Sequence, residues 1–291
     1  MKIEKLASGK YVVAVSGGVD SVTLLNVLSK QPKLELIVAH FDHGIRPTSA
    51  DDRKFVENLA KSYSLPFESE AGKLGKNASE ALARNARYKF LYKIQKKHKA
   101  KAVVTAHHQD DLIETIIINM LRGTGRKGVT ALQNQNDLLR PMLQNSKHEI
   151  ISYAEKNGLE WQEDISNLDT AYLRNWVRHN IIPKLSTKDR QTFLKLHEDF
   201  SKRNPEIDRL LAGYISQEIT KFSRQDIIMA DHNVAKELVA GWLRANNVRD
   251  FDQKTIERIV IGAKTLGKGK SIPVTGSTVV EVQDRTLLLK P

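Results

Sequence analysis

The sequence predicts an α/β fold, in which a parallel-sheet domain is followed by a smaller, mainly helical α+β domain. Runs rich in β-branched residues alternate with stretches of helical period in the first part of the chain. Such alternation implies βαβ units and therefore a parallel sheet. Beyond about residue 187 the alternation stops, and helical periods dominate as far as residue 260. We therefore expect two domains, over residues 1–188 and 189–291.

Each expected element has a local signal. Residues 11–15 form a β-branched run, the apolar positions of a helix follow a glycine pair, and Pro32 precedes a second strand at 34–41. A third strand is expected at 102–106. Polar capping residues and apolar residues at helical spacing predict further helices at 49–63, 109–121, 146–157 and 174–185. Another helix, capped by Asn77 or Ser79, is expected to reach Lys97. The tail at 271–289 partly alternates and carries Gln283-Asp284 at a hairpin turn.

Composition bounds the class of protein. The chain has 291 residues, and its 46 Lys and Arg against 34 Asp and Glu give a net charge of +12. A share of 40% hydrophobic and 27% charged residues is typical of a globular protein. Neither a signal peptide nor an apolar run near the roughly 18 residues of a membrane span is present, so we expect a cytoplasmic protein. The positive charge favours a polyanionic partner such as nucleic acid.

The sequence contains no cysteine. That absence excludes disulfides, cysteine-ligated zinc, iron–sulfur clusters and any thiol nucleophile or persulfide carrier. We therefore expect no redox or sulfur cofactor.

The strongest local signal is the segment Ser16-Gly17-Gly18-Val19-Asp20-Ser21, between a strand and a helix. Glycines let the backbone approach a ligand, and the following helix directs its free N–H groups and positive dipole end there, which suits a phosphate or pyrophosphate. The Gly-Lys-Ser/Thr ending of a Walker A loop is missing. Asp20 would repel a phosphate unless it holds Mg²⁺. The alternative is an ordinary glycine turn with an acid in the first helical turn.

Two further polar clusters follow the next strands. The first contains His40 and His43, and the second runs from Thr105 through His107, Asp110 and Asp111 to Glu114. Because the ligand crevice of an open parallel sheet lies outside the carboxyl ends of its strands, we expect both clusters beside the glycine loop. A zinc or other transition-metal site is one alternative. The other is that these residues only cap helices or bond to backbone in the core.

The segment Gly123-Thr-Gly-Arg-Lys-Gly128 matches the dinucleotide fingerprint, but it follows a helix and no helical pattern opens after it. We therefore reject a nicotinamide or flavin site. We expect instead a flexible basic loop near the active edge, with the cations Arg122, Arg126 and Lys127.

Other cations also favour a phosphate-rich partner. No acid occurs between Ala81 and Gln109, where eight cations follow one another: Arg84, Arg87, Lys89, Lys93, Lys96, Lys97, Lys99 and Lys101. Exposed helices usually mix both signs, so contact with a polyphosphate chain is the better explanation. Arg174 and Arg178 share a helix face suited to gripping phosphate, and Lys264, Lys268 and Lys270 form a second basic group.

As a set, these motifs resemble the PP-loop ATP pyrophosphatases and, within them, the tRNA(Ile)-lysidine synthetases. Residues 16–21 are similar to the SGGxDS loop, 40–46 to HxDHGLR with Ile45 in place of Leu, 80–88 to EAxARxxRY, and 105–115 to TAHHxDDxxET. Arg140-Pro141, Asp164-x-Ser-Asn167 and Arg174-Asn-x-x-Arg178 continue in family order. The similarity covers about residues 11–185, and the rest resembles a small tRNA-contacting domain. A further C-terminal domain of longer members is missing, so the resemblance implies a short form.

The resemblance implies a two-step reaction. ATP adenylates the 2-oxo oxygen of the wobble cytidine in the CAU anticodon of tRNA(Ile), and free L-lysine then displaces AMP to form lysidine. It implies that ATP meets Ser16, Gly17, Gly18, Val19, Asp20, Ser21, His40 and His43, with Mg²⁺ on Asp20. Catalysis is expected from Asp20, Arg84, Arg87 and His107, and lysine binding from Asp110, Asp111 and Glu114. The tRNA is expected to contact Arg122, Arg126, Lys127, Arg174, Arg178, Lys268 and Lys270. A homodimer is left open.

Three alternatives remain. A tRNA thiolase of the same superfamily would share the loop and the RNA, but such enzymes usually use cysteines. A small-molecule amidating ligase, such as an NAD or GMP synthetase, would leave the basic segments unexplained. An RNA-binding protein that responds to nucleotide without turnover would have no use for the acids at 110–114, which are costly beside RNA.

Overall fold

The computed structural model describes residues 1–42, 44, 49–72, 80–162, 173–215, 219–249 and 251–291. The chain forms two compact units, Met1–Thr115 with Leu132–Leu185, and Ile116–Ala131 with Ser186–Pro291. Residues 116–131 therefore group with the C-terminal part of the chain, although they lie within the first expected domain. The sequence predicts a catalytic domain over residues 1–188 and a tRNA-contacting domain over 189–291, and these roles stay a prediction.

The first unit contains a five-stranded sheet in the order β3-β2-β1-β4-β5, with every pairing parallel. The strands are β1 (Gly9–Ala14), β2 (Leu34–Asp42), β3 (Phe67–Ala71), β4 (Ala102–Val104) and β5 (Leu138–Leu139). The expected parallel-sheet α/β fold is confirmed. The sequence did not predict β3 and β5, because the former alternates with acids at the sheet edge and the latter has only two residues.

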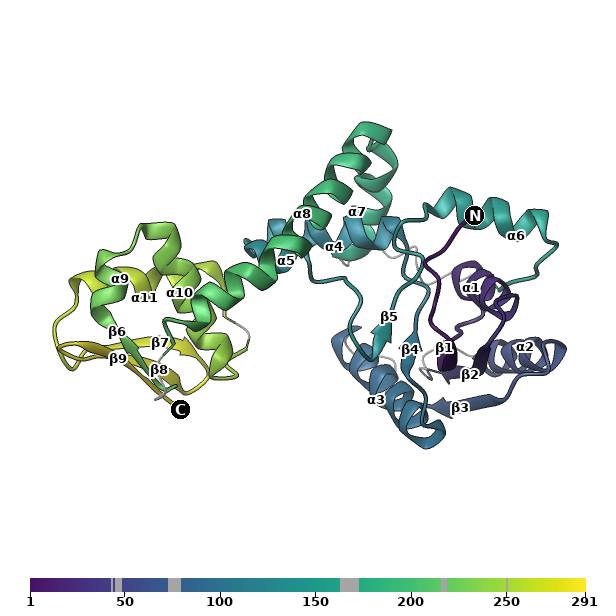
Figure 1. Cartoon of the computed structure of the whole chain (residues 1–291), viewed down its shortest axis with the longest axis horizontal. Helices are drawn as coiled ribbons and strands as arrows, with labels where there is room; N and C mark the ends of the chain where they lie inside the picture. Colours follow the sequence, from purple (N-terminus) through teal and green to yellow (C-terminus); the bar gives the residue numbers. More distant parts are fainter. Residues whose placement is uncertain (43, 45–48, 73–79, 163–172, 216–218, 250) are drawn as a thin grey trace. The chain divides into compact units, whose positions relative to one another are not determined.

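Helices cover both faces of this sheet (Figure 1). They are α1 (Val19–Ser29), α2 (Ser49–Ser62), α3 (Glu80–His98) and α6 (Lys147–Lys156). The unit also contains α7 (Leu173–Asn180), and α4 (Gln109–Leu121) begins in this unit and ends in the second. One buried cluster joins alternate strand residues to α1, α2 and α6, and the other joins the opposite strand residues to α3. No helix in the described ranges is long and apolar enough to cross a membrane.

The helix expected over 174–185 is interrupted. Helix α7 ends at Asn180, and a separate 3₁₀ turn follows at Ile182–Lys184. Pro183 explains the break, because proline has no N–H to donate and its ring clashes with the carbonyl of the preceding turn.

The second unit is the smaller α+β unit that the sequence predicts. Its antiparallel sheet has the order β6-β9-β8-β7. The strands are β6 (Lys221–Ser223), β7 (Ser271–Thr275), β8 (Thr278–Val282) and β9 (Thr286–Lys290), and the helices are α5 (Arg126–Val129), α8 (Thr187–Ala212), α9 (Arg224–Met229), α10 (His232–Ala245) and α11 (Gln253–Thr265). The turn expected at Gln283-Asp284 joins β8 to β9, where the Gln283 N–H donates to the Thr286 carbonyl.

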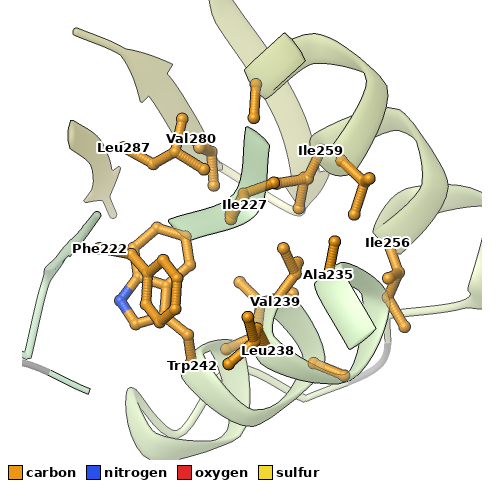
Figure 2. Close-up of a cluster of buried hydrophobic side chains, with 14 of the residues drawn as sticks. Phe222, Ile227, Ala235, Leu238, Val239, Trp242, Ile256, Ile259, Val280 and Leu287 are labelled. Carbon is orange, nitrogen blue, oxygen red and sulfur yellow. The ribbon is translucent and has the colours of Figure 1, made fainter. Parts of the chain in front are cut away.

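Trp242 lies in the core of this unit, among side chains from the sheet and from α9, α10 and α11 (Figure 2). It is fully buried, and its ring centroid lies 5.6 Å from that of Phe222. Its Nε1–H donates to the Ile219 carbonyl at 2.7 Å. The indole therefore packs and also satisfies a backbone group.

We expect Trp242→Ala to destabilise the second unit by about 3–5 kcal/mol, because it leaves a large cavity. Trp242→Phe should cost only about 0.5–1.5 kcal/mol for the lost hydrogen bond, because Asn246 Nδ2 still donates to the Ile219 carbonyl at 2.7 Å. Urea unfolding followed by circular dichroism measures both, with Trp176→Phe as the control, because Trp176 is 45% exposed. Equal losses in Trp242→Phe and Trp176→Phe would contradict the role of the buried indole.

Candidate active site

The glycine loop is held by its own serine. Ser21 Oγ accepts the N–H groups of Ser16 and Gly17, each at 3.2 Å, and donates to the Gly18 carbonyl at 2.9 Å. Gly17 has a φ of +99°, a conformation that side chains with a Cβ rarely adopt. Gly18 is the N-cap of α1 and makes no side-chain cap bond. The first N–H groups of α1 are thus directed toward the loop, as an anion site requires.

His40 supports the strand that leads into this loop. Its side chain is 4% exposed, and Nδ1 lies 2.9 Å from the Val15 carbonyl, so Nδ1 carries the proton and donates. Burial lowers the pKa of His40. His40 therefore acts on the loop through Val15. His43 lies outside the described residues.

A buried acid on α4 is held by two arginines of α7. Glu114 is 1% exposed; its Oε1 lies 2.9 Å from Arg174 Nε and its Oε2 lies 3.0 Å from Arg178 Nε. Arg178 Nη2 also lies 3.3 Å from Asp111 Oδ1. Burial raises the pKa of Glu114 to about 7, although both arginines favour its charged form. The two arginines expected to grip phosphate are thus paired with two acids expected to bind lysine.

His108 connects the acids of α4 to the glycine loop. Its Nδ1 accepts the Asp110 backbone N–H at 3.2 Å, so Nε2 carries the proton. That Nε2 lies 3.4 Å from Asp111 Oδ2 and 3.8 Å from Asp20 Oδ2. Burial raises the pKa of Asp111, but its interactions with His108, His107 and Arg178 prevail and lower it. Carboxylates from two helices therefore converge on one imidazole, and Asp110 lies beside them, half-buried.

Asp20 also pairs with a lysine that sequence reasoning missed. Lys147, at the start of α6, places its Nζ 2.6 Å from Asp20 Oδ1. His108 lies within the cluster expected at 105–114, but no role was expected of it. One signal could have found Lys147: a cation is unusual in the first turn of a helix, where acids are preferred.

His107 faces a group of arginines. Its Nδ1 lies 2.8 Å from Thr105 Oγ1. Burial, helped by the charges of Arg140, Arg87 and Arg84, lowers the pKa of His107 to about 3 against the opposing pull of Asp111. The imidazole is therefore neutral at pH 7, and it is a weak base.

The arginines gather around Tyr88. The guanidinium carbons of Arg84 and Arg87 lie 4.8 and 5.5 Å from the Tyr88 ring centroid. Burial lowers the pKa of Arg87 and of Arg140. Arg140 is 3% exposed, and its Nε has no hydrogen-bond partner within the described part of the chain. This concentration of positive charge on one side of His107 suits an anionic ligand.

We expected a flexible basic loop at 123–128, and for Arg126 this expectation is wrong. Arg126 begins α5 and is 8% exposed, and its guanidinium contacts Asp208 at 2.8 Å and Glu237 at 2.9 Å. Lys127 also pairs with Asp208. Arg126 thus ties α5 to α8 and α10, whereas Arg122 is exposed.

The other cations expected at tRNA are on the surface of the second unit. Lys268 and Lys270 are exposed, and Lys268 pairs with Asp284 at 2.6 Å. In the first unit, helix α3 carries most of the cations that follow one another without an intervening acid. Acidic side chains of strand β3, which the sequence did not predict, neutralise part of this charge. Glu70 pairs with Lys93 at 2.6 Å, and Glu68 pairs with Lys97 and with His98 at 2.7 Å.

The donor atoms fit Mg²⁺ better than a transition metal. Among the residues that the structure describes, no group of three or more His, Cys, Asp or Glu side chains could hold a metal ion. Mg²⁺ is usually held by one or two carboxylates together with substrate phosphates and water. Asp20, with Asp111 across His108, supplies carboxylates of this kind beside the phosphate-binding loop.

Comparison with known proteins identifies the family. The PP-loop domain family matches residues 2–185. The chain belongs to the PP-loop family. A tRNA(Ile)-lysidine synthase from Thermotoga sp. (strain RQ2) is 35% identical over 233 residues, which cover 76% of this chain and 55% of that protein. One from Francisella tularensis is 29% identical over 302 residues, covering 99% of this chain and 75% of the relative.

The PP-loop fold also agrees with a solved structure. The U34-tRNA thiolase NcsA from Methanococcus maripaludis aligns with a TM-score of 0.57 at 17% identity, covering 68% of this chain and 73% of the thiolase. Similarity at that identity shows a shared fold. This chain spans about half the length of the first curated lysidine synthases that it matches.

We expect the His107 imidazole to remain neutral down to pH 5, because burial holds its pKa near 3. Between pH 6.5 and 3 the unfolded chain then binds a proton that the folded chain does not, so stability falls as the pH is lowered. Histidine-ring NMR, assigned with His107→Gln, measures this directly. The urea-unfolded chain is the control, with a normal pKa of about 6.5. A His107 signal that titrates near 6.5 in the folded protein would contradict the assignment.

Proposed function

We propose that this PP-loop protein attaches free L-lysine to carbon 2 of the wobble cytidine in the CAU anticodon of tRNA(Ile), using ATP. The observation that carries the proposal is the convergence of Asp20 with the α4 acids, directly beyond the glycine loop. A phosphate loop next to clustered carboxylates suits a reaction that joins a nucleotide to a cationic substrate. Sequence similarity to lysidine synthases over 76% or more of the chain supports the choice of substrate.

The first step is adenylation of the cytosine 2-oxo oxygen, with release of pyrophosphate. The loop at 16–21 would bind the pyrophosphate through the free N–H groups at the start of α1, because Ser21 Oγ already accepts those of Ser16 and Gly17. Asp20 would hold Mg²⁺, which supplies charge neutralisation when bound. Arg84 and Arg87 would stabilise the charge that develops on the α-phosphate. Their stacking on Tyr88 keeps both guanidiniums in one region of the site.

The second step is attack by the ε-amine of lysine on carbon 2, with loss of AMP. The amine must lose a proton first, because its ordinary pKa is about 10.4. We propose that a nearby carboxylate or His107 accepts that proton; His107 is neutral at pH 7, but its pKa of about 3 makes it the weaker base. Asp110, Asp111 and Glu114 would bind the ammonium groups of lysine. The side chain of Asp111 is 21% exposed and that of Glu114 only 2%, so Asp111 would meet lysine first.

The tRNA would contact the two units through their cations. We propose Arg122, Lys268 and Lys270 for this role, with His40 and His43 on the ATP side. Lys127, Arg174 and Arg178 would contact the tRNA only by exchanging the acids that now hold them. Arg126 is buried and paired within the second unit, and we do not propose it for direct contact. Arg122, Lys268 and Lys270 are exposed, which is the simplest arrangement for contact with phosphate. Residues 1–188 would then form the catalytic domain and 189–291 the tRNA-contacting domain. A cytoplasmic location and a homodimer remain predictions.

We expect complete turnover only when ATP, L-lysine and a tRNA(Ile) with a CAU anticodon are all present. Mass spectrometry of the digested nucleosides should then show lysidine in place of the wobble cytidine. Unmodified cytidine, with folded protein and all three substrates present, would contradict the proposal. A sulfur-containing nucleoside would instead favour the thiolase, although the chain has no cysteine.

Asp20→Ala is the control in that experiment. It should abolish modification and leave tRNA binding within about threefold, because the carboxylate itself contributes no attraction to phosphate. Loss of tRNA binding in Asp20→Ala would mean that Asp20 is structural.

A further inference from the structure

We propose that Lys147 is a phosphate-binding residue. In the nucleotide-free protein it forms an ion pair with the Asp20 carboxylate, and once Asp20 binds the metal ion it contacts the pyrophosphate portion of ATP. The inference rests on the proposed function only through its first substrate, ATP. It starts from the ion pair of Lys147 Nζ with Asp20 Oδ1 at 2.6 Å, within the first unit. Asp20 is the loop acid that would otherwise repel a phosphate.

The backbone that carries Lys147 is rigidly placed. Ser146 and Glu149 form a complete capping box at the start of α6. Ile150 and Ala154 of the same helix are fully buried in the cluster that contains residues of α1. Because α1 also carries Asp20, the core fixes the distance between the two backbone positions. The long lysine side chain is then the adjustable part.

Stability does not explain the choice of lysine here. The side chains of Lys147 and Asp20 are 37% and 30% exposed, and ion pairs of such exposure contribute about 0–1 kcal/mol. A cation in the first turn opposes the helix dipole by a similar amount, about 0.3–1 kcal/mol. The ion pair therefore contributes little to the stability of the fold, and breaking it costs little free energy. Such a residue is suited to exchanging partners.

Charge balance gives Lys147 its second partner. ATP brings several negative charges to a loop whose own side chain, Asp20, is negative. When Asp20 binds the metal ion, the Lys147 ammonium group no longer has the Asp20 carboxylate as its ion-pair partner. The ammonium group then lies next to the triphosphate without a partner of opposite charge. A lysine on a flexible stem is a mobile point charge that can follow the phosphate oxygens. By contrast, the Arg178 guanidinium is engaged by Glu114 and Asp111.

The test measures nucleotide binding without tRNA or lysine. Calorimetry with Mg²⁺ and α,β-methylene-ATP, which cannot release pyrophosphate, compares the wild type with Lys147→Met and Lys147→Arg. We expect about tenfold weaker binding for Lys147→Met, the value of one charge-assisted contact, and near-normal binding for Lys147→Arg. AMP affinity should not change, because AMP has no pyrophosphate. Lys30→Met is the matched control, since Lys30 bonds Tyr153 of α6 and is remote from the loop.

The metal alone gives an independent readout. Mn²⁺ binding to the nucleotide-free protein, followed by electron paramagnetic resonance, should be several-fold tighter in Lys147→Met, because the competing cation is gone. Equal loss of AMP and α,β-methylene-ATP binding, or no loss of either, would overturn the proposal. If thermal melting shows that Lys147→Met is unfolded, Lys147→Gln takes its place. Failure of lysidine formation would leave these binding results intact, so the two proposals fail separately.

Discussion

The site depends on one nearly buried carboxylate, Glu114, and the two arginines that hold it. A buried charge is costly unless it is paired, and removing either partner would leave the other uncompensated. Arg174 and Arg178 of helix α7 form ion pairs with Glu114 near the start of α4, and these pairs hold the two helices together. Through Arg178, Asp111 and His108, the same network extends to Asp20 in the glycine loop. The glycine loop and the acidic cluster are thereby parts of one connected arrangement.

Much of this arrangement could be predicted from sequence. The parallel sheet follows from β-branched runs alternating with helical periods, and the position of the loop follows from glycines between a strand and a helix. The convergence of 16–21 with 105–114 needs only the rule that strand ends meet at one edge. These inferences succeed because each depends on local patterns and on a topology with few alternatives.

Ion pairs between distant elements could not be predicted in the same way. Lys147 meets Asp20 across 127 positions of sequence, and Arg126 meets Asp208 and Glu237 across 82 and 111. Neither cation has a periodic signal that reveals its partner. Strand β3 was missed as well, and with it the acids Glu68 and Glu70 that neutralise part of α3. A run of cations in sequence therefore overstates the free positive charge on the folded surface.

In the reaction that we propose, the site activates the tRNA before lysine takes part. Isotope exchange between labelled pyrophosphate and ATP tests it most directly, because the exchange reports reversible adenylation. The account predicts exchange that requires tRNA(Ile) with a CAU anticodon and proceeds without lysine. Exchange that requires lysine and proceeds without tRNA would contradict it, since the amino acid would then be the adenylated substrate.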